Sequence, residues 1–313
     1  LIFVLESADA AFTPTFQATL PDLLPDEQDY TKALSLSRLA YDLESVASPM
    51  LAAVLLTVMS FHSLFMGTVV GFIASAALVI SAVLPKSKIP EKRGIYERTT
   101  RGIRIYLATP RLRGLLALNL AIAAASAMVI VNTVVLVQAQ FGLTQRATAL
   151  ALAAFGGGSM LAALFLPKVL ENISDRLAML GGATVLTIGL FIGGFTHTYV
   201  SVCILWLILG IGYSLAQTPS GRLLRRSSNS EDRPSLFAAQ YALSHVCWLI
   251  TYPLAGGIGA KFGLNIAFWT LGLVATISIM LAAYVWPKLD RDELEHSHTD
   301  LPENHPHFLE HLA

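Results

Sequence analysis

The sequence predicts an all-α membrane protein with nine transmembrane helices in two related halves. Its 313 residues are 54% hydrophobic and 13% charged, with a mean hydropathy of +0.61, which is too apolar for a soluble domain of this length. Apolar spans of about 20 residues, the length that an α-helix needs to cross a bilayer, recur along the chain. Because backbone groups in lipid must be paired within each segment, and strict alternation is lacking, helices are favoured over a barrel. The spans are residues 1–20, 34–61, 63–84, 114–137, 147–166, 177–195, 199–217, 235–258 and 264–286.

An internal repeat predicts the two halves. Thr13-Pro14 is followed by a short acidic loop and then by a span that carries Ser48-Pro49-Met-Leu-Ala-Ala53. Thr218-Pro219 is followed by a polar loop and then by a span that carries Tyr252-Pro253-Leu-Ala-Gly-Gly257. Two chance Thr-Pro pairs are the alternative. The matched order of span, loop and span favours a parallel duplication, as in two-halved secondary transporters.

The distribution of charge predicts the topology. If the spans alternate in direction, one side receives almost all Lys and Arg residues, and the other receives only Arg146 and Lys261. Cytoplasmic loops carry such an excess, so the central loop and the C-terminus are expected in the cytoplasm. The formal net charge of zero points to no partner. Cys203 and Cys247 lie inside spans and are expected to be packing residues.

Four segments follow from the order of the spans. Residues 1–85 are expected to be the C-terminal part of an N-terminal bundle, and residues 86–113 a basic cytoplasmic linker. Residues 114–286 are expected to form a six-helix bundle, and residues 287–313 a His-rich cytoplasmic tail. An odd number of spans in a duplicated layout suggests that three helices precede Leu1, so that the nine correspond to helices 4–12 of twelve.

The first two spans hold the carboxylates expected to matter. Spacings of three, four and four residues place Glu6, Asp9, Thr13 and Gln17 on one helical face. A carboxylate near the bilayer centre costs about 2.5–3.5 kcal/mol, so such a face usually meets a cavity or a partner. For Glu6, a position near the headgroups is the alternative.

In the second span Arg38 and Asp42 are i, i+4 neighbours that could pair. They are either a structural ion pair near the cytoplasmic mouth or part of a proton relay. A relay favours the carboxylate that lies deeper and is unpaired, which points to Glu44.

Later spans add weaker candidates. Asn119, Ser126 and Thr133 recur at intervals of seven on one side of a helix, and Gly156-Gly-Gly158 permits close helix approach or bending. One face carries Cys203, Trp206, Gly210, Tyr213 and Gln217 and is either pathway lining or packing surface. His245 is either a titrating group or a hydrogen-bonded packing residue.

The basic linker and the tail each leave two interpretations open. Residues 100–113 mix apolar side chains with arginines, which suits an interfacial helix as well as a solvated linker; a nucleic-acid partner is not expected. The tail either captures a transition metal or merely solubilises the end of the chain. Its histidines are His296, His298, His305, His307 and His311.

These features together resemble the major facilitator superfamily. Ser48-Pro49-Met-Leu-Ala-Ala53 resembles the antiporter signature of its fifth helix, with Ser in place of the first Gly, Ala-Ala in place of Gly-Gly, and Glu44 where an upstream Gly is usual. Tyr252, Pro253, Gly256 and Gly257 are the second-half counterpart, and Asp175-Arg176 is what remains of a loop motif.

One branch of this superfamily is the most similar. Phe12-Thr-Pro-Thr-Phe16 and Arg101-Gly-Ile-Arg-Ile-Tyr106 are similar to the branch of macrolide-efflux and enterobactin-exporter proteins, with nickel-resistance permeases nearby. The resemblance implies that the fourth, seventh and tenth helices line a central cavity, which would place the Asp9 face, Asn119, Thr133, Tyr213 and Gln217 there. It also implies that the Pro49 and Pro253 helices rock between the halves.

The function predicted is proton-coupled efflux of a small molecule, drug-like or siderophore-like, by a monomer that uses no cofactor. Asp9 or Glu44 would carry the proton. Export of nickel, cobalt or another transition metal with the His-rich tail is the alternative, and a non-transporting scaffold, sensor or inactive fragment is the alternative of another class. The chain has no Gly-rich phosphate loop, nucleophile elbow or catalytic carboxylate pair, so it is not expected to be an enzyme.

Overall fold

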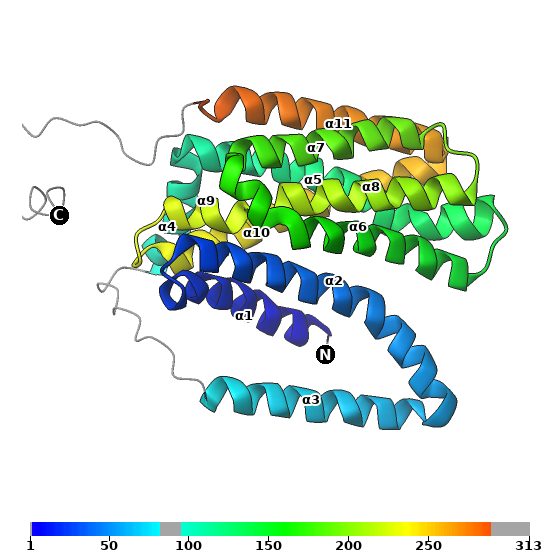
Figure 1. Ribbon diagram of the computed structural model, residues 1–313, viewed down its shortest axis with the longest axis horizontal. Helices are drawn as coiled ribbons and strands as arrows, with labels where there is room; N and C mark the ends of the chain where they lie inside the picture. The colour runs from blue at the N-terminus through cyan, green and yellow to red at the C-terminus, as the bar shows by residue number, and fades with distance from the viewer. Residues whose placement is uncertain (1, 82–94, 289–313) are drawn as a thin grey trace, which may run out of the picture.

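The computed structural model describes residues 2–81 and 95–288. It also describes the side-chain surroundings of these residues, apart from 2–9, 11, 46–47, 49–50, 52–54, 56–57 and 95–99. The described part is built from eleven α-helices and a short π-helical segment, with no strand among them (Figure 1). The prediction of an all-α protein is therefore confirmed.

A helix occupies each of the nine predicted spans. The bounds differ from those predicted mainly because the ends extend into polar sequence: Asp26 caps the second helix by accepting hydrogen bonds from the Gln28 and Asp29 amides, at 2.9 and 3.0 Å. The helices are α1 (Ile2–Leu23), α2 (Glu27–Val58), α3 (Phe61–Ser81), α5 (Pro110–Val134, continued by the π-helix η1 over Val135–Gln140), α6 (Gln145–Asn172), α7 (Asp175–Gly193), α8 (Tyr199–Gln217), α10 (Arg233–Phe262) and α11 (Leu264–Val285).

Six helical stretches in the described residues are long and apolar enough to cross a membrane by length and composition. They are α3, α5 with η1, α6, α7, α8 with α9 (Ser220–Arg226), and α11. The other three predicted spans, α1, α2 and α10, fall short of that composition because they carry most of the polar and charged residues. α1 and α2 are also helices through which the N-terminal part meets the C-terminal part, on α10 and α6 respectively.

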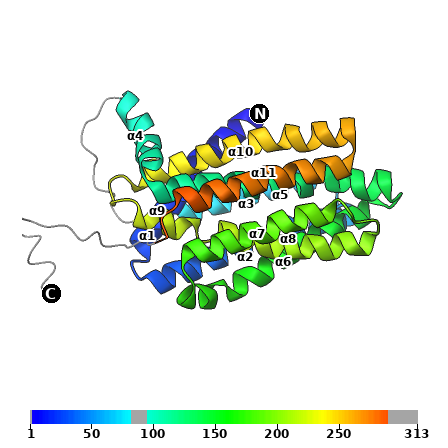
Figure 2. The same cartoon turned by 90° about the horizontal axis from the view of Figure 1, so that it is seen from above.

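The C-terminal helices form the packed core. α5 lies in their midst and contacts α7, α8, α10 and α11, and Leu115, Leu118 and Ala121 on it are fully buried (Figure 2). Small side chains such as Ala123 and Ala124 let neighbouring helices come close, which is how helices associate in lipid.

α6 and α8 approach each other closely at the Gly-Gly-Gly run, as predicted. A Cβ atom on Gly158 would lie 1.9 Å from the Leu207 carbonyl oxygen, and one on Gly210 would lie 1.9 Å from the Phe155 carbonyl oxygen. Only glycine fits at either position. The predicted role of the run in close packing is therefore confirmed at Gly158, and the packing interpretation of Gly210 with it.

The N-terminal helices pack against one side of the C-terminal bundle. α1 packs on α10 and α2 packs on α6, whereas α3 contacts the end of α2 and has no buried residue (Figure 1). Its exposed side chains are apolar, for example Phe72, Ile73 and Ile80, and suit a surface in contact with lipid.

Two short helices lie at one end of the molecule. α4 (Ile95–Ala108) packs on the start of α10, where a Cβ on Gly102 would be 1.9 Å from the Ser235 carbonyl oxygen. Residues 95–108 therefore form a docked helix and not a solvated linker. We call this end the basic end; it comprises the α1–α2 connection, α4, α9, the start of α10 and the end of α11 (Figure 2).

Candidate functional site

The Arg38–Asp42 pair predicted from the i, i+4 spacing forms in α2. Both oxygens of Asp42 accept hydrogen bonds from Arg38: Nε donates to Oδ2 at 3.1 Å, and Nη2 donates to Oδ1. The side chains are only 12% and 4% exposed, so the ion pair is withdrawn from solvent. Such two-point pairing uses the planar fork of the guanidinium and fixes its direction.

Arg38 also joins α2 to two helices of the C-terminal bundle. Its Nε donates to Ser159 Oγ on α6 at 3.2 Å, and its Nη1 donates to Tyr213 Oη on α8 at 3.4 Å. The guanidinium carbon lies 4.4 Å from the centre of the Tyr213 ring, which adds a cation–π contact. We call Arg38, Asp42, Ser159 and Tyr213 the junction cluster.

A buried ion pair of this kind is not explained by stability alone. Desolvation of two charges offsets most of their attraction, and apolar substitutes are often as stable. Asp42 is the only carboxylate paired with Arg38 among the described residues, so without its charge Arg38 would be left buried with only hydroxyls and aromatic rings as partners. The junction cluster therefore combines a protonatable group with a contact between the two parts of the chain.

The polar residues predicted on α5 face the interior of the C-terminal bundle. Asn119 donates to Gln240 Oε1 at 3.3 Å, and Tyr106 of α4 donates to the same oxygen at 2.5 Å. Thr133 accepts a hydrogen bond from Trp206 Nε1 at 2.8 Å. Both side chains are buried and join helices in this arrangement, and their role in a pathway stays a prediction.

Of the other predicted residues whose side-chain surroundings are described, none joins the junction cluster. Glu44 is exposed, two residues along the helix from Asp42, and Gln17 is exposed on α1 while Thr13 is half-buried. Glu6 and Asp9 lie in α1, but their side-chain surroundings are outside the described residues. Gln217 is half-buried at the last residue of α8, next to the basic end.

His245 is exposed on α10. Its Nδ1 lies 2.7 Å from the Tyr241 carbonyl oxygen, and its ring centre lies 4.0 Å from that of Tyr241 in a tilted contact, so it is a hydrogen-bonded surface residue of this helix.

The antiporter-like residues sit inside long helices. Ser48 is exposed and Pro49 falls within the continuous α2, although the surroundings of its side chain are outside the described residues. In α10, Tyr252 and Pro253 are exposed, Gly256 approaches Val131 and Gly257 faces open space. These positions leave their proposed role in helix rocking as a prediction.

The basic end carries a set of ion pairs that sequence reasoning missed. Glu27 of α2 lies 2.6 Å from Arg222 and 2.5 Å from Arg226, and both arginines also pair with the buried Asp175, at 3.0 and 3.1 Å. Asp22 of α1 pairs with Arg233. An acidic loop of the N-terminal part thus meets a basic loop of the C-terminal part. The signal that could have found it is that these loops hold equivalent places in the repeat and carry opposite charge.

No group suited to hold a metal ion occurs in the part of the chain that is described, where three or more His, Cys, Asp or Glu side chains never gather. Cys203 and Cys247 are free thiols. The five tail histidines lie outside the described residues, so their proposed metal binding stays a prediction.

Comparison with known proteins places this architecture in a family. The family model of the major facilitator superfamily matches residues 115–309, which is more than half of the chain and spans the whole C-terminal bundle. No curated protein gives a match. The matched region includes five of the six apolar stretches described above. With its helical bundle and apolar spans, the chain therefore belongs to the major facilitator superfamily and is a multi-pass membrane transport protein.

Proposed function

We propose that this protein is a proton-coupled exporter of a small organic molecule, drug-like or siderophore-like, in the inner membrane of a bacterium. The single observation that carries the proposal is the junction cluster, where a buried carboxylate holds an arginine that reaches across to α6 and α8. The resemblance of residues 12–16 and 101–106 to efflux proteins supports the direction of transport. The basic end faces the cytoplasm in this proposal, because it gathers the arginines.

The cycle follows from the charge on Asp42. While Asp42 is ionised, Arg38 is held between α2 and the C-terminal bundle, and the basic end stays closed. A proton arriving from outside neutralises Asp42, which weakens the contact and favours opening toward the cytoplasm. Release of the proton there restores the ion pair and closes the basic end again. Inward proton movement would thus be coupled to outward movement of substrate.

This cycle moves the proposed proton site from the residues favoured by sequence. The sequence favoured Asp9 or Glu44 as the proton carrier, whereas the buried ion pair with Arg38 supports Asp42 in this proposal. Glu44 lies exposed on the same helix and so provides a matched comparison.

The test is substrate flux in proteoliposomes of the purified full-length protein under an imposed pH gradient, with ethidium as a drug-like probe. Asp42→Asn should abolish the dependence on the gradient, and Glu44→Gln should preserve it. Asp9→Asn is included because its surroundings are not described. A gradient response that survives Asp42→Asn would overturn the assignment, and Ni²⁺ flux that is lost on removal of the tail would favour metal export.

A second measurement does not depend on knowing the substrate. Spin labels at Lys32 on α2 and Lys168 on α6, both exposed, report the opening of the basic end in a background without native cysteines. Acidification should increase the long-distance population in the wild type and leave Asp42→Asn unchanged. Identical responses in the two proteins would contradict the coupling role of Asp42.

A further inference from the structure

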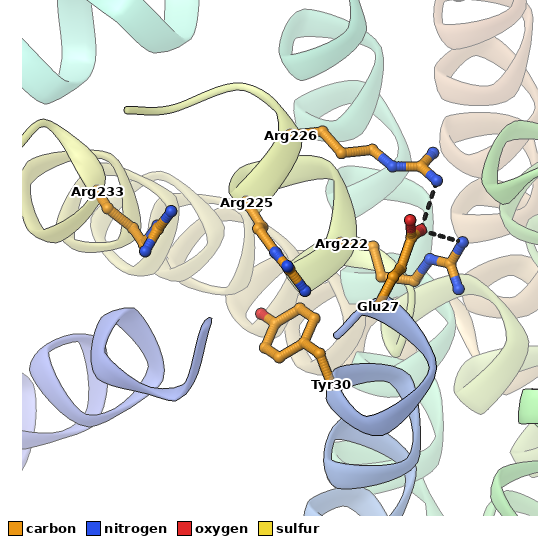
Figure 3. A pocket seen from close by; sticks show the side chains of 6 residues that line it. All are labelled: Glu27, Tyr30, Arg222, Arg225, Arg226 and Arg233. Carbon is orange, nitrogen blue, oxygen red and sulfur yellow. Dashed lines mark hydrogen bonds and ion pairs between the residues drawn. The ribbon is translucent and has the colours of Figure 1, made fainter. Parts of the chain in front are cut away.

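A cavity of about 340 Å³ at the basic end is lined almost entirely by cationic side chains. Tyr30 and Glu27 reach it from the start of α2, Arg222, Arg225 and Arg226 from α9, and Arg233 from the first residue of α10 (Figure 3). The cavity therefore lies where the N-terminal helices meet the C-terminal bundle. Its volume is at the lower end of the range for small-molecule sites.

Among the described residues, the charges around this cavity do not balance. Its arginines are matched by three carboxylates: Glu27 and Asp175 serve Arg222 and Arg226, and Asp22 serves Arg233. Arg225 has no carboxylate partner among the described residues. It donates instead to the Pro25 carbonyl oxygen and lies over the Tyr30 ring, 5.1 Å from its centre. One positive charge is thus left over.

Besides Arg222 Nε, which lies 3.0 Å from Asp175 Oδ1, three hydrogen-bond donors at the cavity are unused. Arg225 Nη1, Arg233 Nε and Tyr30 Oη are buried and have no hydrogen-bond partner in the described part of the molecule. Tyr30 is fully buried, and Figure 3 shows its hydroxyl turned toward the space between Arg225 and Arg233. Buried polar atoms without a partner cost free energy, so a molecule that accepts from them would be bound favourably.

The donors specify the kind of ligand. Burial raises the pKa of Tyr30 to about 12, despite the opposing effect of Arg225 and Arg233, so its hydroxyl remains protonated at neutral pH and donates. Guanidinium groups that approach from several directions, together with one hydroxyl, match an oxyanion that has three or more acceptor oxygens. A phosphate group meets this description better than a carboxylate, which has two oxygens.

We infer that this cavity, the Tyr30–Arg225 site, binds a phosphate group and that the bound group holds the basic end closed. The phosphate would bridge α2 and the α9–α10 segment, and would therefore bind this arrangement more tightly than one in which the halves have separated. Binding itself follows from the cavity; only the effect on closure rests on the proposed transport cycle.

Binding is tested with inorganic phosphate on the purified full-length protein, by calorimetry at constant ionic strength with chloride as the reference anion. Tyr30→Phe removes one hydroxyl and nothing else, and should weaken phosphate binding about tenfold. Arg225→Gln removes the unbalanced charge and should weaken it about a hundredfold. Lys168→Gln removes an exposed charge near the same end, outside the cavity, and should leave the affinity unchanged.

A second experiment distinguishes a lipid headgroup from free inorganic phosphate as the source of the phosphate group. Vesicles of phosphatidylcholine with added phosphatidic acid are compared with vesicles of phosphatidylcholine alone, and thermal unfolding is measured with and without inorganic phosphate. Stabilisation by phosphatidic acid alone, lost in Tyr30→Phe and Arg225→Gln, identifies a lipid headgroup. Stabilisation by inorganic phosphate with the same variant pattern identifies a free phosphate.

Two results would overturn the inference: no stabilisation by either source, or equal affinities in the wild type and the two cavity variants. Thermal unfolding without phosphate shows whether each variant is folded. The spin labels at Lys32 and Lys168 then test closure, since phosphate should reduce the long-distance population. If transport by Asp42→Asn still depends on the pH gradient, the proposed function fails. If phosphate in the same experiments still binds and closes the basic end, this inference stands.

Discussion

The C-terminal bundle and the N-terminal helices are held together by different kinds of contact. Inside the C-terminal bundle, fully buried leucines, alanines and aromatic rings interdigitate, as where Trp206 and Phe268 lie 6.1 Å apart between ring centres. Between the two parts, some apolar side chains such as the buried Ala18 also pack, but the contact is distinguished by hydrogen bonds that run through arginines: Arg38 to α6 and α8, and Arg222, Arg226 and Arg233 to α1 and α2.

The difference teaches which part can move. Close-packed interiors resist small changes in shape, whereas ion pairs can exchange for water with little change in packing. The C-terminal bundle is thus suited to move as one body, and the arginine contacts are suited to break and form again. Substitutions in the two kinds of contact should therefore have different consequences.

The largest effect is expected inside the C-terminal bundle, at Gly158. Gly158→Ala places a Cβ against the Leu207 backbone, which cannot withdraw without separating α6 from α8. We expect a loss of about 3 kcal/mol in the free energy of unfolding, seen as a lower thermal midpoint and poor recovery of monodisperse protein. Gly157→Ala is the matched control, because nothing lies within 4 Å of a Cβ there. Equal midpoints for both variants would mean that the helices are not in close contact.

The next effect is expected between the two parts, at Arg222. Arg222→Gln leaves the buried Asp175 with one guanidinium and removes the donor to Thr31 Oγ1. We expect about 2 kcal/mol less stabilisation of the closed basic end, so the open population rises about thirtyfold while the C-terminal bundle stays folded.

The spin-label distance between Lys32 and Lys168 reports this change. Arg113→Gln is the control, since Arg113 is exposed at the same end. A lowered unfolding midpoint without any change in distance would show that Arg222 supports the fold and not the closure.

How much of the fold and of the candidate site the sequence predicts depends on how far apart in the chain the contacting residues lie. The spans, the Arg38–Asp42 pair and the glycine run at Gly158 can be read from local sequence, because the residues that define each lie within one stretch of about 20 residues. Glu44 was favoured over Asp42 because Asp42 has Arg38 as a possible partner and Glu44 does not. The sequence does not show which of the two side chains the fold buries. The structure buries Asp42 and exposes Glu44.

The contacts at the basic end cannot be predicted from local sequence. Arg226 and Glu27 are 199 positions apart, and nothing local says which of several carboxylates an arginine will meet. The unbalanced Arg225 is visible only once all the partners are placed. Opposite charge in two repeat-related loops was the one clue in the sequence, and it predicts attraction between the loops but not a cavity.

A smaller effect is expected where α4 joins the C-terminal bundle through a neutral contact. Tyr106→Phe removes the hydroxyl that donates to Gln240 Oε1, and Asn119 still donates to that oxygen. We expect a loss of about 1 kcal/mol in the free energy of unfolding, measured by thermal unfolding. Burial raises the pKa of Tyr106, so the hydroxyl stays protonated and the loss should be the same at neutral and mildly alkaline pH. A loss that disappears at mildly alkaline pH would show that the hydroxyl ionises and is not buried as described.

The smallest effect is expected for an ion pair that faces solvent. Lys32 and Asp29 lie 3.1 Å apart on α2, but both side chains are 59% exposed, so water screens the pair. Lys32→Gln should change the unfolding midpoint by less than the equivalent of about 0.5 kcal/mol, and it should leave the opening of the basic end unaltered. For this variant, opening is followed by labels at Gln28 and Lys168, which are both exposed. An effect as large as that of Arg222→Gln would mean that any positive charge at this end holds the halves together. A small effect would show that the burial of an arginine and its place between the two parts decide closure.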